Sequence, residues 1–399
     1  MAGVGSQGQA ARKGGNMGAE QIRTVAVIGA GDMGHGIAEV ALLAGYRVFL
    51  RDIEQRFVEK GIQRIEESLK KLLDKGKLAQ EHYERIHKDL LRPCLDLGEA
   101  VREADLVIEA IPEILELKQA TFQEMDRKAP PQTILASNTS TMRITEIAKA
   151  TKRPEKVLGL HYFNPAVLMK LVEVIRGEQT SEETMQKGYD FCLKTGKVPV
   201  RVEKDVPGFI VNRVQAPGGV LLGCILDHNI AQPEEVDALL RKLGLPMGPY
   251  ELMDYTGIDI NYHASRYFAQ AVHPDFAPAK AIEEKVKAGL LGKKTGRGFY
   301  DWSKGRPAID PAKATDKVDP MDLLAVQINE ATKLLEMGVC SPEDIDKAMV
   351  NGTGNVIGPM TVARSQDPQA LTSRLERLAD RFNKEIFRPT RTIREGAYR

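Results

Sequence analysis

Cysteine is scarce in this sequence, and the common metal-binding patterns are missing from it. The 399 residues include only four cysteines, and no two of them form a C-x-x-C pair. The histidines other than His161 show no metal-ligand spacing, and no H-E-x-x-H, P-loop or G-x-S-x-G motif occurs. These absences argue against a disulfide framework or a zinc site. No metal is expected, and a reducing compartment, the cytoplasm, is favoured.

A strong charge of either sign and a long apolar run are also absent. Lys and Arg number 56 against 55 for Asp and Glu, which argues against nucleic acid or an anionic membrane as the main partner. The most apolar stretch, 25–45, contains Asp32, His35 and Glu39, so neither a membrane-spanning helix nor a signal peptide is predicted. Residues 1–22, rich in Gly, Ala and Gln, are predicted to be a disordered tail.

Short apolar runs alternate with longer helical patterns in residues 23–205. This alternation predicts an α/β domain of the Rossmann type with a mostly parallel sheet. The stretch 56–77 between two of the runs has the spacing of an exposed amphipathic helix. The predicted strands are Val25–Ile28, Val48–Leu50, Leu106–Ala110, Ile134–Ala136, Val157–Leu160, Leu171–Ile175 and Val198–Val202.

Beyond residues 203–208 helical periodicity dominates, and the sequence repeats itself. Pro233–Asp237 matches Pro342–Asp346 at an offset of 109, and Gly248-Pro249 matches Gly358-Pro359 at an offset of 110. Proline followed by acidic residues is a typical helix start. We therefore expect an all-α region made of two repeated helical domains, 206–303 and 316–399, with a hinge near 203–208.

A G-x-G-x-x-G motif follows the first predicted strand and opens a helix. Its residues are Gly29, Ala30, Gly31, Asp32, Met33 and Gly34. Backbone N–H groups and a helix N-terminus at such a turn can bind a pyrophosphate. Asp52 ends the second strand, where a carboxylate accepts the ribose hydroxyls, so NAD is favoured over NADP, although Arg51 beside it weakens that preference. A flavin, or a glycine turn without a ligand, is the alternative.

His161 and Glu173 are the first candidates for chemistry. His161 follows an apolar strand, and Glu173 lies inside the next one, where an unpaired carboxylate is costly. If the two strands form a hairpin, His161 lies opposite Glu173, and the pair is typical of a general base with an orienting acid. A purely structural His–Glu pair, or an exposed Glu173, would give the same pattern.

Two further polar residues are predicted to lie at the same edge of the sheet. Ser140 belongs to the segment Asn138–Thr141, which follows a strand, and Asn212 begins the helical region. Either side chain could bond a substrate oxygen. Each could equally cap a helix.

Six ordered motifs together resemble the L-3-hydroxyacyl-CoA dehydrogenase family, which includes the 3-hydroxybutyryl-CoA dehydrogenases. The resemblance covers most of the chain, from Arg23 to about Ala363. The motifs are Val27–Gly34, Ala136–Ser140, His161–Pro165, Met169–Val174, Pro207–Arg213 and Gly292–Gly296.

The resemblance implies an NAD-dependent oxidation of a 3-hydroxyacyl-CoA, with short chains favoured. It implies that His161 takes the proton from the 3-hydroxyl, that Glu173 orients the imidazole, and that Ser140 and Asn212 hold the substrate. The implied cofactor contacts, beyond the glycine motif and Asp52, are Glu113, Lys118, Ser140, Asn164 and Lys294. The implied contacts to CoA are Ser68 and Lys75.

The duplicated helical region departs from the shorter members of the family, which carry one helical domain and dimerise through it. The second copy has Met321 where the first has Asn212, so we expect it to be structural. It would replace a dimer partner in a monomer, with a homodimer as the alternative, and no hydratase activity is expected. A dehydrogenase of a free hydroxy or sugar acid, similar to L-gulonate dehydrogenase, and a non-catalytic NAD-binding protein are the alternative functions.

Overall fold

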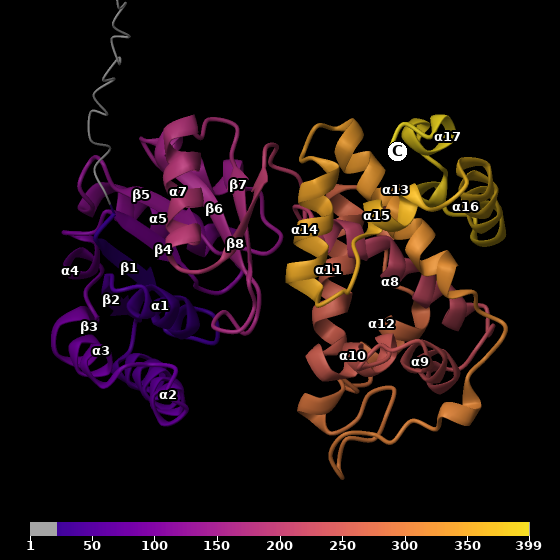
Figure 1. Ribbon diagram of the computed structural model, residues 1–399, viewed down its shortest axis with the longest axis horizontal. Coiled ribbons are helices and arrows are strands. Elements are labelled where there is room, and N and C mark those ends of the chain that lie inside the picture. The colour runs from indigo at the N-terminus through magenta and orange to yellow at the C-terminus, as the bar shows by residue number, and fades with distance from the viewer. Residues whose placement is uncertain (1–21, 399) are drawn as a thin grey trace, which may run out of the picture.

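The computed structural model describes residues 22–398, so nearly all of the predicted tail, 1–21, lies outside the described residues. An α/β domain is followed by a helical region (Figure 1). The α/β domain holds an eight-stranded sheet in the order β3-β2-β1-β4-β5-β6-β7-β8. The strands are β1 Thr24–Ile28, β2 Arg47–Arg51, β3 Leu91–Cys94, β4 Leu106–Glu109, β5 Ile134–Ser137, β6 Val157–Tyr162, β7 Leu171–Arg176 and β8 Val198–Val202.

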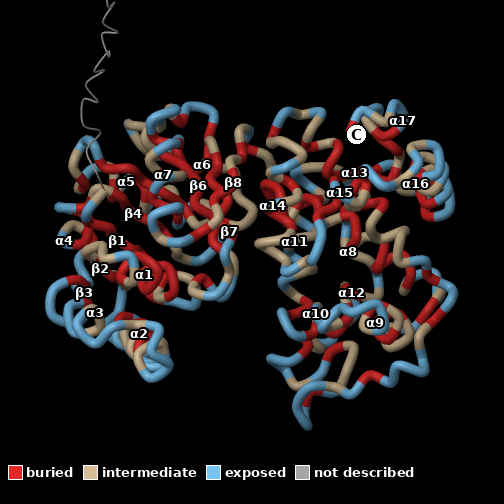
Figure 2. The backbone as a smooth tube through the Cα atoms, viewed as in Figure 1, coloured by how far each residue is buried: buried red, intermediate tan, exposed pale blue. Residues whose placement is uncertain are grey.

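All neighbouring strands are parallel except β6 and β7, which are antiparallel. The prediction of a Rossmann-type, mostly parallel sheet is therefore confirmed. The strand order reverses between β1 and β4, which is where ligands bind in such sheets. The central strands are buried (Figure 2), in keeping with their continuous apolar sequences. The sequence did not reveal the edge strand β3, because Arg92 and Pro93 interrupt its apolar pattern.

The helices of this domain are amphipathic and cover the sheet. α2, for example, buries Val58, Ile65 and Leu69 and exposes its charged side. The helices are α1 Gly34–Leu43, α2 Gln55–Asp74, α3 Gln80–Arg85, α4 Leu97–Val101, α5 Leu115–Lys128, α6 Ile144–Ala148 and α7 Glu182–Lys194, and short helices occupy Ile86–Leu90 and Pro154–Lys156.

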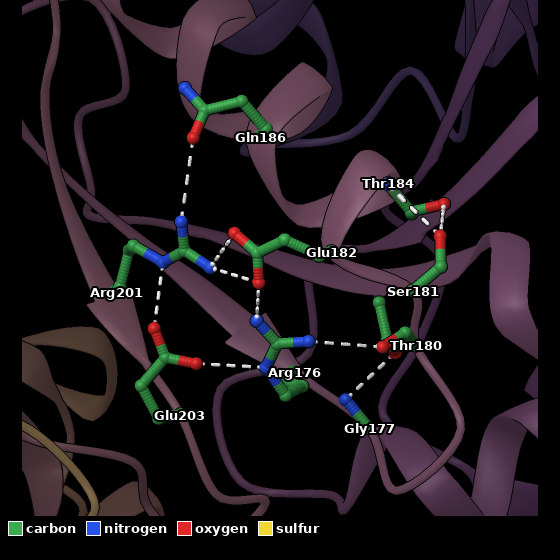
Figure 3. A network of polar contacts seen from close by, with 9 residues as sticks. All are labelled: Arg176, Gly177, Thr180, Ser181, Glu182, Thr184, Gln186, Arg201 and Glu203. Carbon is green, nitrogen blue, oxygen red and sulfur yellow. Dashed lines mark hydrogen bonds and ion pairs between the residues drawn. The ribbon is translucent and has the colours of Figure 1, made fainter.

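A charged network joins the last two strands of the sheet, β7, which carries Glu173, and β8, to α7 (Figure 3). Arg176 at the end of β7 and Arg201 in β8 both pair with Glu203, with nitrogen–oxygen distances of 2.8 and 2.7 Å. Both also pair with Glu182 in the first turn of α7. Shared partners of this kind join β7, β8 and α7.

The helical region contains two sets of helices in the same order. The first set is α8 Val211–Asp227, α9 Pro233–Lys242, α10 Pro249–Thr256, α11 Ile258–Ala271 and α12 Lys280–Lys287, with short turns at Pro274–Phe276 and Lys293–Thr295. The second set is α13 Pro320–Glu336, α14 Pro342–Thr353, α15 Pro359–Arg364, α16 Pro368–Phe382 and α17 Arg391–Glu395, with turns at Pro311–Lys313 and Glu385–Phe387.

The repeated sequence signature is a shared helix cap. The Asp237 carboxylate accepts from the N–H groups of Tyr250 and Glu251, and the Asp346 carboxylate accepts from those of Met360 and Thr361. The glycine before each proline allows this approach. A Cβ on Gly248 would lie 2.3 Å from Asp237, and one on Gly358 would lie 2.2 Å from Asp346.

The second set of helices contacts both other parts of the protein. α13 packs along α8, and α14 packs against β7 and β8 (Figure 1). A backbone hydrogen bond from Glu203 to Val339 also joins the sheet edge to the second set. In residues 22–398 no helix is both long and apolar enough to cross a membrane.

Candidate active site

The glycine motif forms the turn between β1 and α1. Gly29 has φ +107°, and a Cβ on Gly34 would lie 1.7 Å from the carbonyl oxygen of Gly29, so only glycine fits there. α1 has no side-chain cap at its N-terminus, next to Asp32 and Met33. This uncapped helix end, approached by bare backbone, fits the pyrophosphate of a dinucleotide.

Asp52 lies at the end of β2 and orders the same turn. One carboxylate oxygen accepts from the N–H of Ala30 at 2.7 Å, and the other accepts from the N–H of Ile53 at 2.7 Å. Each oxygen keeps a lone pair that can accept from a ribose hydroxyl. Arg51 lies beside Asp52 and is the residue that weakens the preference for NAD expected from the sequence. Its side chain donates to the carbonyl of Leu95 at 2.9 Å.

Lys118 is the centre of a buried charge network beside this turn. Its ammonium is 2.7 Å from Glu109 and 3.2 Å from Glu113, and Lys118 and Glu109 are both fully buried. Ser137 donates to the other oxygen of Glu109 at 2.6 Å. The sequence did not indicate Glu109, although a carboxylate within the apolar run of β4 was a signal that could have revealed it.

Glu113 connects that network to the segment carrying Ser140. Its carboxylate accepts from the N–H of Ser140 at 3.1 Å and from the hydroxyl groups of Thr139 and Thr141. Burial alone would raise the pKa of Glu113. The cation of Lys118 and these hydrogen bonds outweigh burial and lower the pKa below its ordinary value. Glu113 is therefore a carboxylate held in a fixed position.

β6 and β7 form an antiparallel hairpin, and His161 and Glu173 lie opposite each other in it, the arrangement that the sequence predicted for a hairpin. Nδ1 of His161 lies 2.6 Å from Oε2 of Glu173, and their side chains are 6% and 0% exposed. Because a carboxylate only accepts, Nδ1–H donates, and in the neutral form of this tautomer the free lone pair lies on Nε2. The ring of Phe163 lies 4.4 Å from the imidazole.

The second oxygen of Glu173 binds the start of α8. It accepts from the N–H groups of Ile210 and Val211 at 3.0 and 2.9 Å. Such helix-terminal donors stabilise a buried carboxylate. The alternative of an exposed Glu173 is therefore wrong.

Ser140 and Asn212 meet although they are 72 residues apart. Nδ2 of Asn212 donates to the carbonyl oxygen of Ser140 at 3.1 Å. Neighbouring residues of this segment make further polar contacts. The hydroxyl of Thr139 accepts from the N–H of Met142 at 3.0 Å, and Oδ1 of Asn138 accepts from the N–H of Tyr162 at 2.8 Å.

The residues implied for CoA are Ser68 and Lys75, whereas Asn164 and Lys294 are implied for the cofactor. Ser68 and Asn164 both line a pocket of about 430 Å³ between α2 and the loop after β6. Lys75, at the end of α2, is not among the residues that line it. Lys294 lies in the turn next to α10, where its ammonium pairs with Asp259 at 2.5 Å. Neither Lys75 nor Lys294 lines this pocket, and their implied roles stay predictions.

Glu39 is a buried acid that the sequence did not identify as a site residue. It lies on α1 with 1% exposure and accepts from the hydroxyl of Ser68 at 2.6 Å. Burial raises the pKa of Glu39 to about 7, although the Ser68 hydrogen bond and the charge of Lys197 act to lower it. The hydroxyl implied for CoA is thus directed to a group that titrates near neutrality.

Replacing Glu39 with Gln is expected to stabilise the protein at neutral and alkaline pH but hardly at acidic pH. The pKa of Glu39 is higher in the folded state than the ordinary value of 4.5, so its stabilising contribution is complete below pH 4.5 and is lost as the pH rises through about 7. The variant should gain up to about 3 kcal/mol in unfolding free energy at pH 8 and little at pH 5. Urea unfolding of both proteins at the two pH values measures this, and an equal difference at both would contradict it.

Comparison with known proteins identifies the family. Residues 24–206 match the family described as "3-hydroxyacyl-CoA dehydrogenase, NAD binding domain", and residues 208–302 and 322–397 match "3-hydroxyacyl-CoA dehydrogenase, C-terminal domain". The chain is 34% identical to a 3-hydroxyadipyl-CoA dehydrogenase of Escherichia coli K12, with 94% of this chain and 98% of the relative covered. It is 41% identical to a probable 3-hydroxybutyryl-CoA dehydrogenase of Bacillus subtilis, over 71% of this chain and 99% of the relative.

Among solved structures, a 3-hydroxybutyryl-CoA dehydrogenase from Escherichia coli K12 superposes with a TM-score of 0.87 at 34% identity. It covers 94% of this chain and 98% of its own. The dinucleotide turn, the buried His–Glu pair and these matches agree. The chain belongs to the 3-hydroxyacyl-CoA dehydrogenase family and is an NAD-dependent oxidoreductase.

Proposed function

We propose that this enzyme oxidises short-chain (S)-3-hydroxyacyl-CoA to 3-oxoacyl-CoA, with 3-hydroxybutyryl-CoA and acetoacetyl-CoA as the reacting pair, and that His161 is the general base. One observation carries the proposal. The imidazole is held at 2.6 Å by a buried carboxylate, which is itself held by the first N–H groups of α8. A base fixed in this way is ready to accept a proton at one known atom, Nε2.

In the proposed step the substrate loses a proton and a hydride, and each goes to a different acceptor. Nε2 of His161 takes the proton of the 3-hydroxyl, and Glu173 stabilises the imidazolium that forms. Bound NAD supplies the acceptor for the hydride that leaves C3. Ser140 and Asn212, joined by their hydrogen bond, orient the hydroxyl and the thioester.

The proposed contacts to NAD follow from the geometry of the turn. The segment Gly29–Gly34 would hold the pyrophosphate, and Asp52 would accept the ribose hydroxyls. The remaining contacts proposed on the strength of the resemblance are Glu113, Lys118, Ser140, Asn164 and Lys294.

For CoA we propose the pocket lined by Ser68, with Lys75 farther along α2 as a cation for a phosphate. In the structure the Ser68 hydroxyl donates to Glu39. A protonated Glu39 would instead donate to Ser68 and free that hydroxyl to donate to an anion, because a hydroxyl has one proton and two lone pairs.

The proposed organisation has three structural units, 23–205, 206–303 and 316–399, with the last in the place of a dimer partner. A monomer is proposed, with a homodimer as the alternative to be decided by light scattering. The four cysteines are unpaired, which supports a reducing compartment, and we propose the cytoplasm.

Initial rates of NADH and NADPH oxidation, each with acetoacetyl-CoA and with free acetoacetate, test the function. Fast turnover is expected with the thioester and NADH. NADPH should lower kcat/KM at least about 100-fold, because the 2′-phosphate would face the carboxylate of Asp52. Turnover with free acetoacetate alone would move the function to a free hydroxy acid. NADH binding without any turnover would indicate a binding protein.

A further inference from the structure

The first turn of α8 is held from three directions. Its backbone N–H groups at Ile210 and Val211 donate to Glu173, and Asn212 donates to Ser140. Both of these contacts reach the proposed active site in the α/β domain. The third contact, made by the next residue, Arg213, reaches the second set of helices instead.

Arg213 forms a buried ion pair with Glu330 of α13. Its Nε lies 2.5 Å from Oε1 of Glu330, and the two side chains are 8% and 1% exposed. The other oxygen of Glu330 accepts from Lys333 at 2.9 Å, and Lys333 also donates to the carbonyl of Ile386 at 2.8 Å. Removing two charges from water costs several kcal/mol per ion, so such a pair is weak evidence for a stabilising role.

The equivalent residues of the two copies do not form a second, reciprocal pair. The residue 109 positions before Glu330 is Leu221, and the residue 109 positions after Arg213 is Asp322. Leu221 cannot form an ion pair, and Asp322 pairs with Arg374 and Arg377 of its own copy. The contact between α8 and α13 therefore places a carboxylate of the second copy beside the site of the first, with no reciprocal pair at the equivalent positions.

We infer that Glu330 is a positioning residue for the reaction. The second set of helices holds the first turn of α8 through Arg213, and this turn holds Glu173 and Asn212 in register with His161 and Ser140. The inference rests on the function proposed above for His161 and Glu173. It gives the second helical copy, which has Met321 in place of Asn212, a direct part in the geometry of the site.

The full-length variants Glu330→Gln and Arg213→Met/Glu330→Leu test this role. Glu330→Gln keeps an oxygen acceptor for Arg213 but removes the charge, and kcat with acetoacetyl-CoA should fall about 10- to 100-fold, because small displacements of a catalytic group are costly. The NADH dissociation constant should not change, since the glycine turn lies on β1 and α1. The double variant replaces the pair with apolar side chains of similar size, so its urea midpoint should match or exceed that of the wild type. Its kcat should remain low.

Asp322→Asn is the matched control. It removes a charge from α13 at the position equivalent to Arg213, and its kcat should equal that of the wild type. A double variant that recovers both stability and kcat would show a purely structural pair and overturn the inference. A loss of kcat in Asp322→Asn as large as that in Glu330→Gln would overturn it too. If the double variant does not fold, an unchanged kcat in folded Glu330→Gln overturns the inference by itself.

Failure of the proposed function looks different from failure of this inference. An inactive wild type, or a fully active His161→Gln variant, overturns the proposed function and the inference with it. A fully active double variant beside an inactive His161→Gln variant overturns only the role of Glu330.

Discussion

His161→Gln is expected to lower kcat with acetoacetyl-CoA and NADH about 10³-fold, since a positioned general acid or base contributes on the order of 10² to 10⁴. Glutamine can still donate to Glu173, but it offers no basic nitrogen at the position of Nε2. The affinity for NADH should be retained, because the dinucleotide turn lies between β1 and α1. Stopped-flow reduction and NADH fluorescence titration measure the two quantities.

The matched control for that variant is His263→Gln, at an exposed position of α11. It should leave both kcat and NADH binding unchanged. A His161→Gln enzyme within a few-fold of wild type would remove His161 from the proposed chemistry. The pair with Glu173 would then be structural, which is the alternative that the sequence alone left open.

Lys118→Met is expected to cause the largest loss of stability, about 3 to 5 kcal/mol. The substitution keeps most of the side-chain volume but leaves the fully buried carboxylate of Glu109 without its cation, 2.7 Å away in the wild type. The remaining donors to Glu109, the N–H of Ile111 and the hydroxyl of Ser137, do not neutralise its charge. Urea unfolding followed by circular dichroism measures the loss.

Lys149→Met is the control for the same chemical change at the surface. Lys149 pairs with Glu146 at 2.8 Å, but the two side chains are 61% and 35% exposed, so the loss should stay below about 1 kcal/mol. The double variant Glu109→Gln/Lys118→Met should recover much of the stability, because it removes the unpaired charge. Equal losses in Lys118→Met and Lys149→Met would contradict the expected cost of the unpaired Glu109.

Features with a local pattern could be predicted from the sequence. The glycine turn and Asp52 lie on adjoining elements, and the strands before and after them have continuous apolar runs. His161 and Glu173 are 12 residues apart in a hairpin, where the period of two determines which side chains face each other. The helical repeat was visible because each copy needs the same cap, Asp237 or Asp346, and the same glycine beside it.

The rest depended on contacts between residues far apart in the chain. The donors to the second oxygen of Glu173 come from residues 37 and 38 positions away, and Arg213 meets Glu330 across 117 positions. Ser68 meets Glu39 across 29 positions and two helices. No local spacing predicts such pairs, because the packing of whole helices decides which buried polar groups meet.

The sequence by itself therefore determined the class of fold and the glycine turn, and it predicted that His161 faces Glu173 if their strands form a hairpin. These follow from the periodicity of single elements and from the few residue types that a tight turn admits. Only the tertiary structure decided which groups complete the charge network of Lys118, which backbone N–H groups bind the second oxygen of Glu173, and that Glu330 of the second copy pairs with Arg213. Buried charges must find partners wherever the fold provides them, and that choice is made when separate elements pack together.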